Sequence, residues 1–175
     1  MIEIPLSEEM RELATIKADE LGQLRNSIRK GKGNKVGFLG EIAVAYFFNG
    51  DLENTYDYDV LAHDCKMEVK TKETTVVPRP DYEGSVATCN LKQRCDIYVF
   101  TRVMKDLETC WICGMIRNDE FLSKARKLTK GQKDGSNGFT VKQNCMNMYY
   151  SDMAIPDKIL DYAERHDLKT LYRHK

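Results

Sequence analysis

The stretch Asp57-Tyr-Asp-Val-Leu-Ala-His-Asp-Cys-Lys-Met-Glu-Val-Lys70 decides the fold of this 175-residue chain. His63 and Asp64 divide it into two short runs, and residues with short polar tips tolerate the backbone of a tight turn. The pattern therefore predicts a β-hairpin that is centred on these two residues. Folding the stretch at that point sets Asp59 opposite Glu68.

The predicted hairpin has one polar face and one apolar face, because side chains alternate along a strand. Asp57 and Lys70 form the next facing pair and share the polar side with Asp59 and Glu68. The apolar side, which we expect to join the core, carries Tyr58, Val60, Met67 and Val69. Two carboxylates that face each other across a strand pair repel each other. We therefore expect a cation to bind between Asp59 and Glu68.

A hard divalent cation suits this polar face. Magnesium prefers oxygen ligands and is usually held by one or two carboxylates together with water and substrate phosphate. Asp59 and Glu68 supply the carboxylates, the Val69 carbonyl adds a third oxygen, and Lys70 is placed to orient a metal-bound water or to offset phosphate charge. The segment thus predicts a site for phosphodiester hydrolysis. Asp57 is the alternative upstream ligand, but Asp59 is preferred because it faces Glu68 directly.

The order of an acidic residue, a hairpin and Glu-x-Lys resembles the PD-(D/E)xK nuclease superfamily. The matching residues are Asp59, Glu68 and Lys70, together with Glu41 in the upstream segment 37–48, whereas Tyr58 stands at the position of the proline. The resemblance implies that Glu41 lies on a core helix and serves as a further catalytic and metal-binding residue. It also implies a magnesium-dependent deoxyribonuclease, with manganese able to substitute for magnesium.

The coarse pattern predicts one α/β domain over residues 1–175, with a central mixed β-sheet flanked by helices. The resemblance implies that this sheet forms a restriction-endonuclease-like core. The predicted parts are an N-terminal helix at 7–30, a core at 36–128 and a C-terminal strand and helix at 139–175. Within the core we expect a buried helix at 36–49, a hairpin at 56–72, a long loop at 73–92, strands at 95–103 and 109–116, and a helix at 119–128.

The chain has no net charge, with 27 basic and 27 acidic residues, which argues against a strongly basic coat protein for nucleic acid. The cations are unevenly spread, however, and local clusters can bind phosphates. The candidate nucleic-acid contacts are Lys30, Lys32, Lys35, Lys72, Arg79 and Lys92. For each of them, an ordinary surface cation is the alternative interpretation.

The six cysteines are expected to be free thiols in an intracellular, cytoplasmic protein. Cys110 and Cys113 have the spacing of a redox or zinc motif, but they lie in a strand pattern, where they would point to opposite faces. The N-terminus lacks the pattern of a signal peptide, and the apolar runs are too short to cross a bilayer. We therefore expect no membrane partner.

Two other functions stay open at this point. The first is a nucleic-acid-binding module that has the same fold but no catalytic activity. The second is a protein–protein interaction domain in which the hairpin charges form a surface salt-bridge ladder, which would stabilise little. DNA is the expected partner, with RNA and a homodimer as open alternatives, and the sequence does not choose between paired and unpaired strands.

Overall fold

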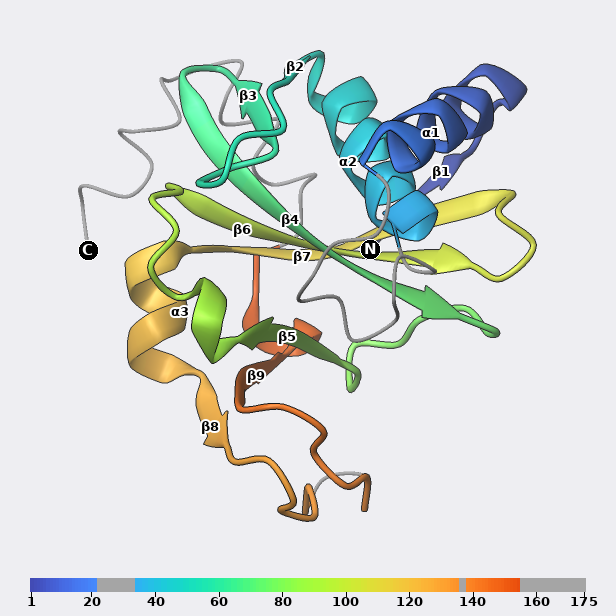
Figure 1. Cartoon of the computed structure of the whole chain (residues 1–175). Helices are drawn as coiled ribbons and strands as arrows, with labels where there is room; N and C mark the ends of the chain where they lie inside the picture. The colour runs from blue at the N-terminus through green and yellow to red at the C-terminus, as the bar shows by residue number, and fades with distance from the viewer. Residues whose placement is uncertain (22–33, 136–137, 155–175) are drawn as a thin grey trace.

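The computed structural model describes residues 1–21, 34–135 and 138–154, which form a large β-sheet with helices on one face and a small sheet on the other (Figure 1). The elements are β1 (Ile2–Pro5), α1 (Glu8–Leu21), α2 (Asn34–Phe48), β2 (Asp51–Leu52), β3 (Val60–Ala62), β4 (Cys65–Thr74), β5 (Glu83–Ala87), η1 (Thr88–Asn90), β6 (Ile97–Met104), β7 (Thr109–Arg117), α3 (Asn118–Lys124), β8 (Arg126–Leu128), β9 (Cys145–Tyr149) and η2 (Tyr150–Asp152). The predicted α/β class with a central mixed sheet is confirmed.

The large sheet has six strands in the order β1-β7-β6-β4-β3-β2. Its centre is the parallel pair β4–β6, whereas the other neighbouring strands run antiparallel. In the parallel register Glu68 lies beside Tyr98, Lys70 beside Phe100 and Lys72 beside Arg102. Parallel strands are typically covered on both faces, and this sheet follows that rule.

Alternation along the central strands gives the molecule two apolar cores. Helices α1 and α2 cover one face, where Met67, Val69 and Val99 are buried. The second sheet, in the order β5-β9-β8, covers the other face together with α3, and Tyr98 and Phe100 are buried beneath it. The polar residues of β4 share the side of Tyr98 and Phe100, so they point toward the second sheet.

Gly84 allows the second sheet to come close to the first. A Cβ atom at this position would lie 2.5 Å from the Phe100 ring, which is far inside ordinary contact distance. Any other residue would therefore push β5 away from β4 and β6. The contact fixes the distance between the polar side of β4 and the second sheet.

Several predicted boundaries need correction. Residues 126–128 form β8 and not the end of a helix, and the predicted loop at 73–92 contains β5 and η1. The strand β1 was not predicted. It pairs with β7 through backbone hydrogen bonds, and a segment of four residues is too short to show a strand pattern in the sequence. The predicted N-terminal helix is confirmed over 8–21. Its remainder and the predicted C-terminal helix lie outside the described residues.

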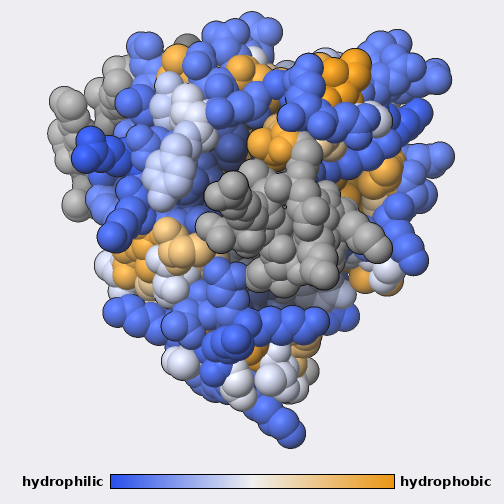
Figure 2. All heavy atoms as spheres, in the orientation of Figure 1, coloured by the Kyte–Doolittle hydropathy of each residue, from blue (hydrophilic) through white to orange (hydrophobic). Residues whose placement is uncertain are grey.

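One face of the molecule is largely polar. On the face shown in Figure 2, hydrophilic residues predominate and the hydrophobic ones form separate patches. Among the helices that the structure describes, none combines the length and the hydrophobicity needed to cross a membrane.

Candidate active site

The hairpin forms where the sequence predicts it. Strands β3 and β4 are joined at His63 and Asp64, whose φ angles are 50° and 57°. Positive φ at both central residues is the mark of the type I′ turn, which matches the twist of paired strands. The pairing continues to Asp59, whose backbone N–H donates to the Met67 carbonyl at 3.0 Å. Val60 and Asp59 thus both lie against Met67, an irregularity of the bulge type, so Asp59 is not the ladder partner of Glu68, although the two carboxyl groups lie close enough to interact.

The predicted pairing of Asp57 with Lys70 is wrong. The Thr55 hydroxyl accepts bonds from the backbone N–H groups of Asp57 and Tyr58, at 3.3 and 3.0 Å, and so holds this segment in a turn. Such local side-chain bonds compete with strand pairing. The Asp57 carboxylate instead accepts a bond from the Arg94 backbone N–H at 3.1 Å. Of the two candidate acids, the geometry therefore favours Asp59.

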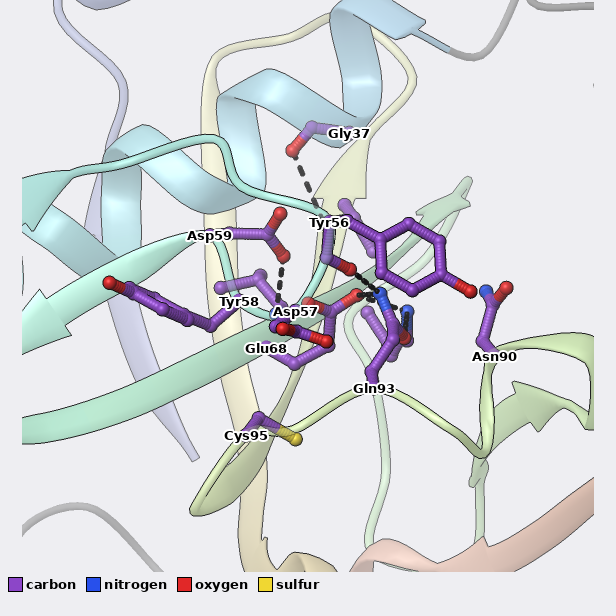
Figure 3. A network of polar contacts seen from close by, with 12 residues as sticks. Gly37, Tyr56, Asp57, Tyr58, Asp59, Glu68, Asn90, Gln93 and Cys95 are labelled. Atoms are coloured by element: carbon purple, nitrogen blue, oxygen red, sulfur yellow. Dashed lines mark hydrogen bonds and ion pairs between the residues drawn. The ribbon is translucent and has the colours of Figure 1, made fainter.

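Glu68 is the centre of the polar network in Figure 3. Its side chain is only 5% exposed, and its Oε1 atom accepts bonds from the Lys70 ammonium and from the Gln93 amide, the latter at 2.8 Å. Its Oε2 atom is buried and has no hydrogen-bond partner within the described part of the chain. A buried carboxylate oxygen without a partner is costly. Glu68 also interacts with the neighbouring Asp59 carboxyl, so a proton or a cation between the two groups would offset this cost.

Gln93 belongs to the site, although sequence reasoning did not find it. Its amide nitrogen also donates to the Tyr56 carbonyl at 2.9 Å, and its amide oxygen accepts from the Lys70 ammonium at 3.2 Å. It therefore ties together Glu68, Lys70 and the loop before β3, and Figure 3 shows it between Glu68 and Tyr56. A neutral residue in a loop carries no charge or periodicity signal, so the sequence gave no reason to select it.

Glu41 reaches the site from α2, and the glycine before it makes this approach possible. A Cβ atom at Gly40 would lie 2.0 Å from Thr71 Oγ1 and 2.6 Å from Thr101 Oγ1. Only glycine lets the helix pack this closely on β4 and β6. The Thr71 hydroxyl adds a bond of 3.4 Å to the Gly37 carbonyl, which Figure 3 also shows. This packing brings Glu41 close enough to Asp59 and Glu68 for their charges to interact.

Burial disfavours the ionisation of all three carboxyl groups, and the charges of neighbouring acids add to this effect at Glu41 and Asp59. Burial, followed by the charges of Asp59 and Glu68, raises the pKa of Glu41 to about 8. Burial and the charge of Glu68 raise the pKa of Asp59 to about 7, although the Val69 N–H, which donates to its carboxylate at 2.8 Å, opposes the shift. Burial raises the pKa of Glu68 as well, and the Lys70 ammonium opposes this shift. Crowded acids with raised pKa values are typical of functional sites.

The donor set fits a magnesium ion without forming a complete cage. In the described ranges, no group of three or more His, Cys, Asp or Glu side chains is arranged as a metal site. Magnesium needs only one or two carboxylates when water and phosphate supply its other ligands. The N–H and C=O groups of one strand residue point to the same side. Because the Val69 N–H bonds Asp59, the Val69 carbonyl also faces the acids.

The predicted nucleic-acid contacts do not form one cluster. Lys30 and Lys32 lie outside the described residues, and Lys35 is half-buried at the start of α2. Lys72 and Arg79 line a common cavity beside the second sheet, where Arg79 also forms two bonds with the Asp81 carboxylate, at 2.9 and 2.7 Å. Lys92 is exposed next to Gln93.

The cysteines behave as buried or unpaired thiols. All six are free, and Cys110 and Cys113 belong to the two different cores, as expected for residues that point to opposite faces of a strand. Burial raises the pKa of both thiols, which leaves them unreactive.

Comparison with known proteins adds no identification, since no family model and no curated protein matches this sequence.

Proposed function

We propose that this protein is a magnesium-dependent nuclease that hydrolyses phosphodiester bonds in DNA. The observation that supports the proposal is the meeting of Glu41, Asp59 and Glu68 in a largely buried site, where Lys70 and Lys17 of α1 supply the positive charge. Among the described residues, only Glu68 of these acids has an ion pair. When all three acids are ionised, their negative charge exceeds the positive charge of the neighbouring lysines, and a divalent cation would balance it.

Each residue has a distinct role in this proposal. Asp59 and Glu68 hold the ion, with the Val69 carbonyl as a further ligand, and Glu41 contributes directly or through water. Bound Mg²⁺, which Mn²⁺ can replace, would lower the pKa of a coordinated water and offset charge on the phosphate. The Lys70 ammonium, freed from Glu68 when the ion binds, orients the attacking water and stabilises negative charge in the transition state. Gln93 is a positioning residue that holds Glu68 and Lys70 in place.

The arrangement of elements supports the finer fold assignment as part of this proposal. The hairpin β3–β4, the parallel neighbour β6, the antiparallel strand β7 and the preceding helix α2 occur in the order expected of a restriction-endonuclease-like core. The resemblance to the PD-(D/E)xK superfamily thus rests on residue types, chain order and spatial proximity together.

Cleavage of labelled DNA by Glu68→Ala and Lys70→Ala variants tests the proposal. We expect each variant to lose about 10²-fold or more in rate in Mg²⁺, because removal of one electrostatic stabiliser commonly has an effect of that size. Lys66→Ala is the matched control, since Lys66 is exposed on the same strand and has no contact with Glu68 in the structure. Wild-type rates for both site variants would exclude the proposed mechanism, as would full activity of the wild type in a chelator.

A further inference from the structure

A second pair of like charges lies farther along β4. Lys72 and Arg102 are neighbours in the parallel register of β4 and β6, and both donate to the Glu83 backbone carbonyl at 3.4 Å. Within the described residues, neither forms an ion pair with a carboxylate. Adjacent like charges on paired strands are unfavourable. An anion that binds between the two cations would remove this repulsion.

These cations line a cavity of about 750 Å³ beside the second sheet. Its size lies within the range of roughly 300–1,000 Å³ that is usual for sites of small organic ligands. Part of the Lys72 side chain is open to solvent, but its ammonium lies within this concave space, where desolvation by the surrounding atoms and the charge of Arg102 lower its pKa to about 8. The acids of the cavity are already engaged, because Arg126 bonds Glu83 and Asp134. The open charge of the cavity is therefore positive.

Aromatic side chains accompany these cations. The Arg102 guanidinium lies over the Tyr82 ring at 5.0 Å and over the Tyr150 ring at 5.6 Å, and Tyr149 and Phe139 also line the cavity. Phe139 is 55% exposed, and the Lys142 ammonium lies over its ring at 5.7 Å from the centroid. Aromatic rings next to positive charge are the recurring means by which proteins hold unpaired nucleotides.

The cavity lies farther along β4 from the candidate active site, on the same side of the strand. One side of β4 carries Glu68, Lys70 and Lys72 at alternate positions, so neighbouring members of this row are roughly 6.6 Å apart along the strand. This spacing is about the rise of two nucleotides in one strand of DNA. A smaller space of about 130 Å³ lies between the two lysines and is lined by Lys70, Lys72 and Ser85. Both Lys72 and Ser85 also line the large cavity.

We propose that the large cavity binds one unpaired nucleotide of a DNA strand that runs along β4 from the carboxylate site. Its phosphate contacts Lys72 and Arg102, and its base stacks among Tyr82 and the neighbouring rings. The inference rests on the proposed nuclease function, because that function supplies the strand. The proposed contacts hold one phosphate and one unstacked base, and extrusion of a paired base costs a few kcal/mol. The preferred substrates are therefore DNA with a single-stranded tail, flap or mismatch.

Fluorescence anisotropy with two DNA duplexes tests this inference. The duplexes are identical except that one carries a short unpaired tail, and binding is measured in Ca²⁺ to limit cleavage. We expect the wild type to bind the tailed duplex about tenfold more tightly than the blunt one. Lys72→Met should lose about tenfold in affinity for the tailed duplex, with a salt slope reduced by about one, while affinity for the blunt duplex stays unchanged.

Matched variants separate the cavity from general charge effects. Lys105→Met removes an exposed lysine at the β6–β7 turn, outside the cavity, and should bind both duplexes as the wild type does. Lys72→Arg should retain the preference for the tail, whereas Tyr82→Leu, which removes the aromatic ring, should reduce it. Equal affinity of the wild type for both duplexes would overturn the inference. A Lys72→Met variant that behaves as Lys105→Met does would also overturn it.

The two proposals fail in different ways. If the wild type binds the tail through Lys72 but cleaves no DNA in Mg²⁺ or Mn²⁺, the nucleotide site stands and the nuclease assignment falls. If the wild type cleaves blunt and tailed DNA equally and Lys72→Met does the same, the nuclease assignment stands and the nucleotide site falls.

Discussion

Replacement of Glu41 by glutamine should make the metal-free protein more stable while it weakens metal binding. The Glu41 carboxyl is enclosed beside Asp59 and Glu68, and its pKa is raised to about 8 by burial and by their charges. Glutamine keeps the size of the side chain and removes the charge. The Glu41→Gln substitution therefore relieves the crowding of acids without opening a cavity.

The direction and size of this effect depend on pH. Below the ordinary pKa of 4.5, the Glu41 carboxyl is protonated in the folded and the unfolded chain, so it adds no pH-dependent cost. As the pH rises toward 8, only the unfolded chain ionises, which favours unfolding. At pH 7, the distance of the pH from the ordinary pKa of 4.5, converted at 1.36 kcal/mol per pH unit, limits the loss of stability caused by Glu41 to about 3 kcal/mol. Because the glutamine amide is itself a buried polar group, we expect a net gain of about 1–2 kcal/mol.

Urea denaturation of wild type and Glu41→Gln at pH 5 and pH 7.5, in a chelator, measures this gain. A chain of this size should also melt about 2–4 °C higher for each kcal/mol. Glu73→Gln is the control, because Glu73 is exposed on β4 and its replacement should change stability by less than about 0.5 kcal/mol. Added Mg²⁺ should stabilise the wild type more than the variant. A gain that is equal at the two pH values, or a variant less stable than wild type at pH 7.5, would refute the reasoning.

Three further outcomes follow from the same geometry. Gly40→Ala should lower the free energy of unfolding by about 1–3 kcal/mol in urea titrations, because the added Cβ would lie 2.0 Å from Thr71 Oγ1. This loss should occur although alanine normally favours helices. Gly135→Ala is the control and should be nearly neutral, because a Cβ at that position meets nothing within 4 Å. Gln93→Leu should slow cleavage by about tenfold or more with little change in DNA affinity, since it releases Glu68 and Lys70; an unchanged single-turnover rate would contradict this role. Mg²⁺ affinity should rise between pH 6 and pH 8 as the crowded acids lose their protons. Calorimetry in buffers of different ionisation enthalpy should detect the release of protons when Mg²⁺ binds. Absence of proton release would contradict the raised pKa values of Glu41 and Asp59.

The local part of the site could be predicted from the sequence because its signals are local. An alternating pattern and two residues suited to positive φ define the hairpin, and the hairpin brings the Asp59 carboxyl near Glu68, although Asp59 is not its partner in the strand ladder. The same alternation predicts that Cys110 and Cys113 point into different cores. Over such short distances, side-chain period and turn chemistry fix the geometry before any tertiary packing is known.

The remaining contacts depend on packing between segments that are distant in the sequence. Arg102 faces the Lys72 side of the sheet only because β6 adopts one particular parallel register with β4, and neither strand specifies that register by itself. Gln93 reaches Glu68 from a loop whose path depends on the start of β6. The departure of Asp57 from the hairpin is local, but the Thr55 hydroxyl that causes it looks like any loop threonine in the sequence.

The order of charges along β4 connects the two proposals. On the side that faces the second sheet, the strand presents an acid at Glu68 and then cations at Lys70 and Lys72. Glu68 lies near another acid, Asp59, and Lys72 lies beside another cation, Arg102. A protein that needed only stability would more readily place opposite charges in these positions. A divalent cation at the first end and a strand of phosphates along the rest would balance both ends at once. The like-charge pairs therefore argue for one extended ligand, a metal-bound DNA strand, and against two unrelated sites.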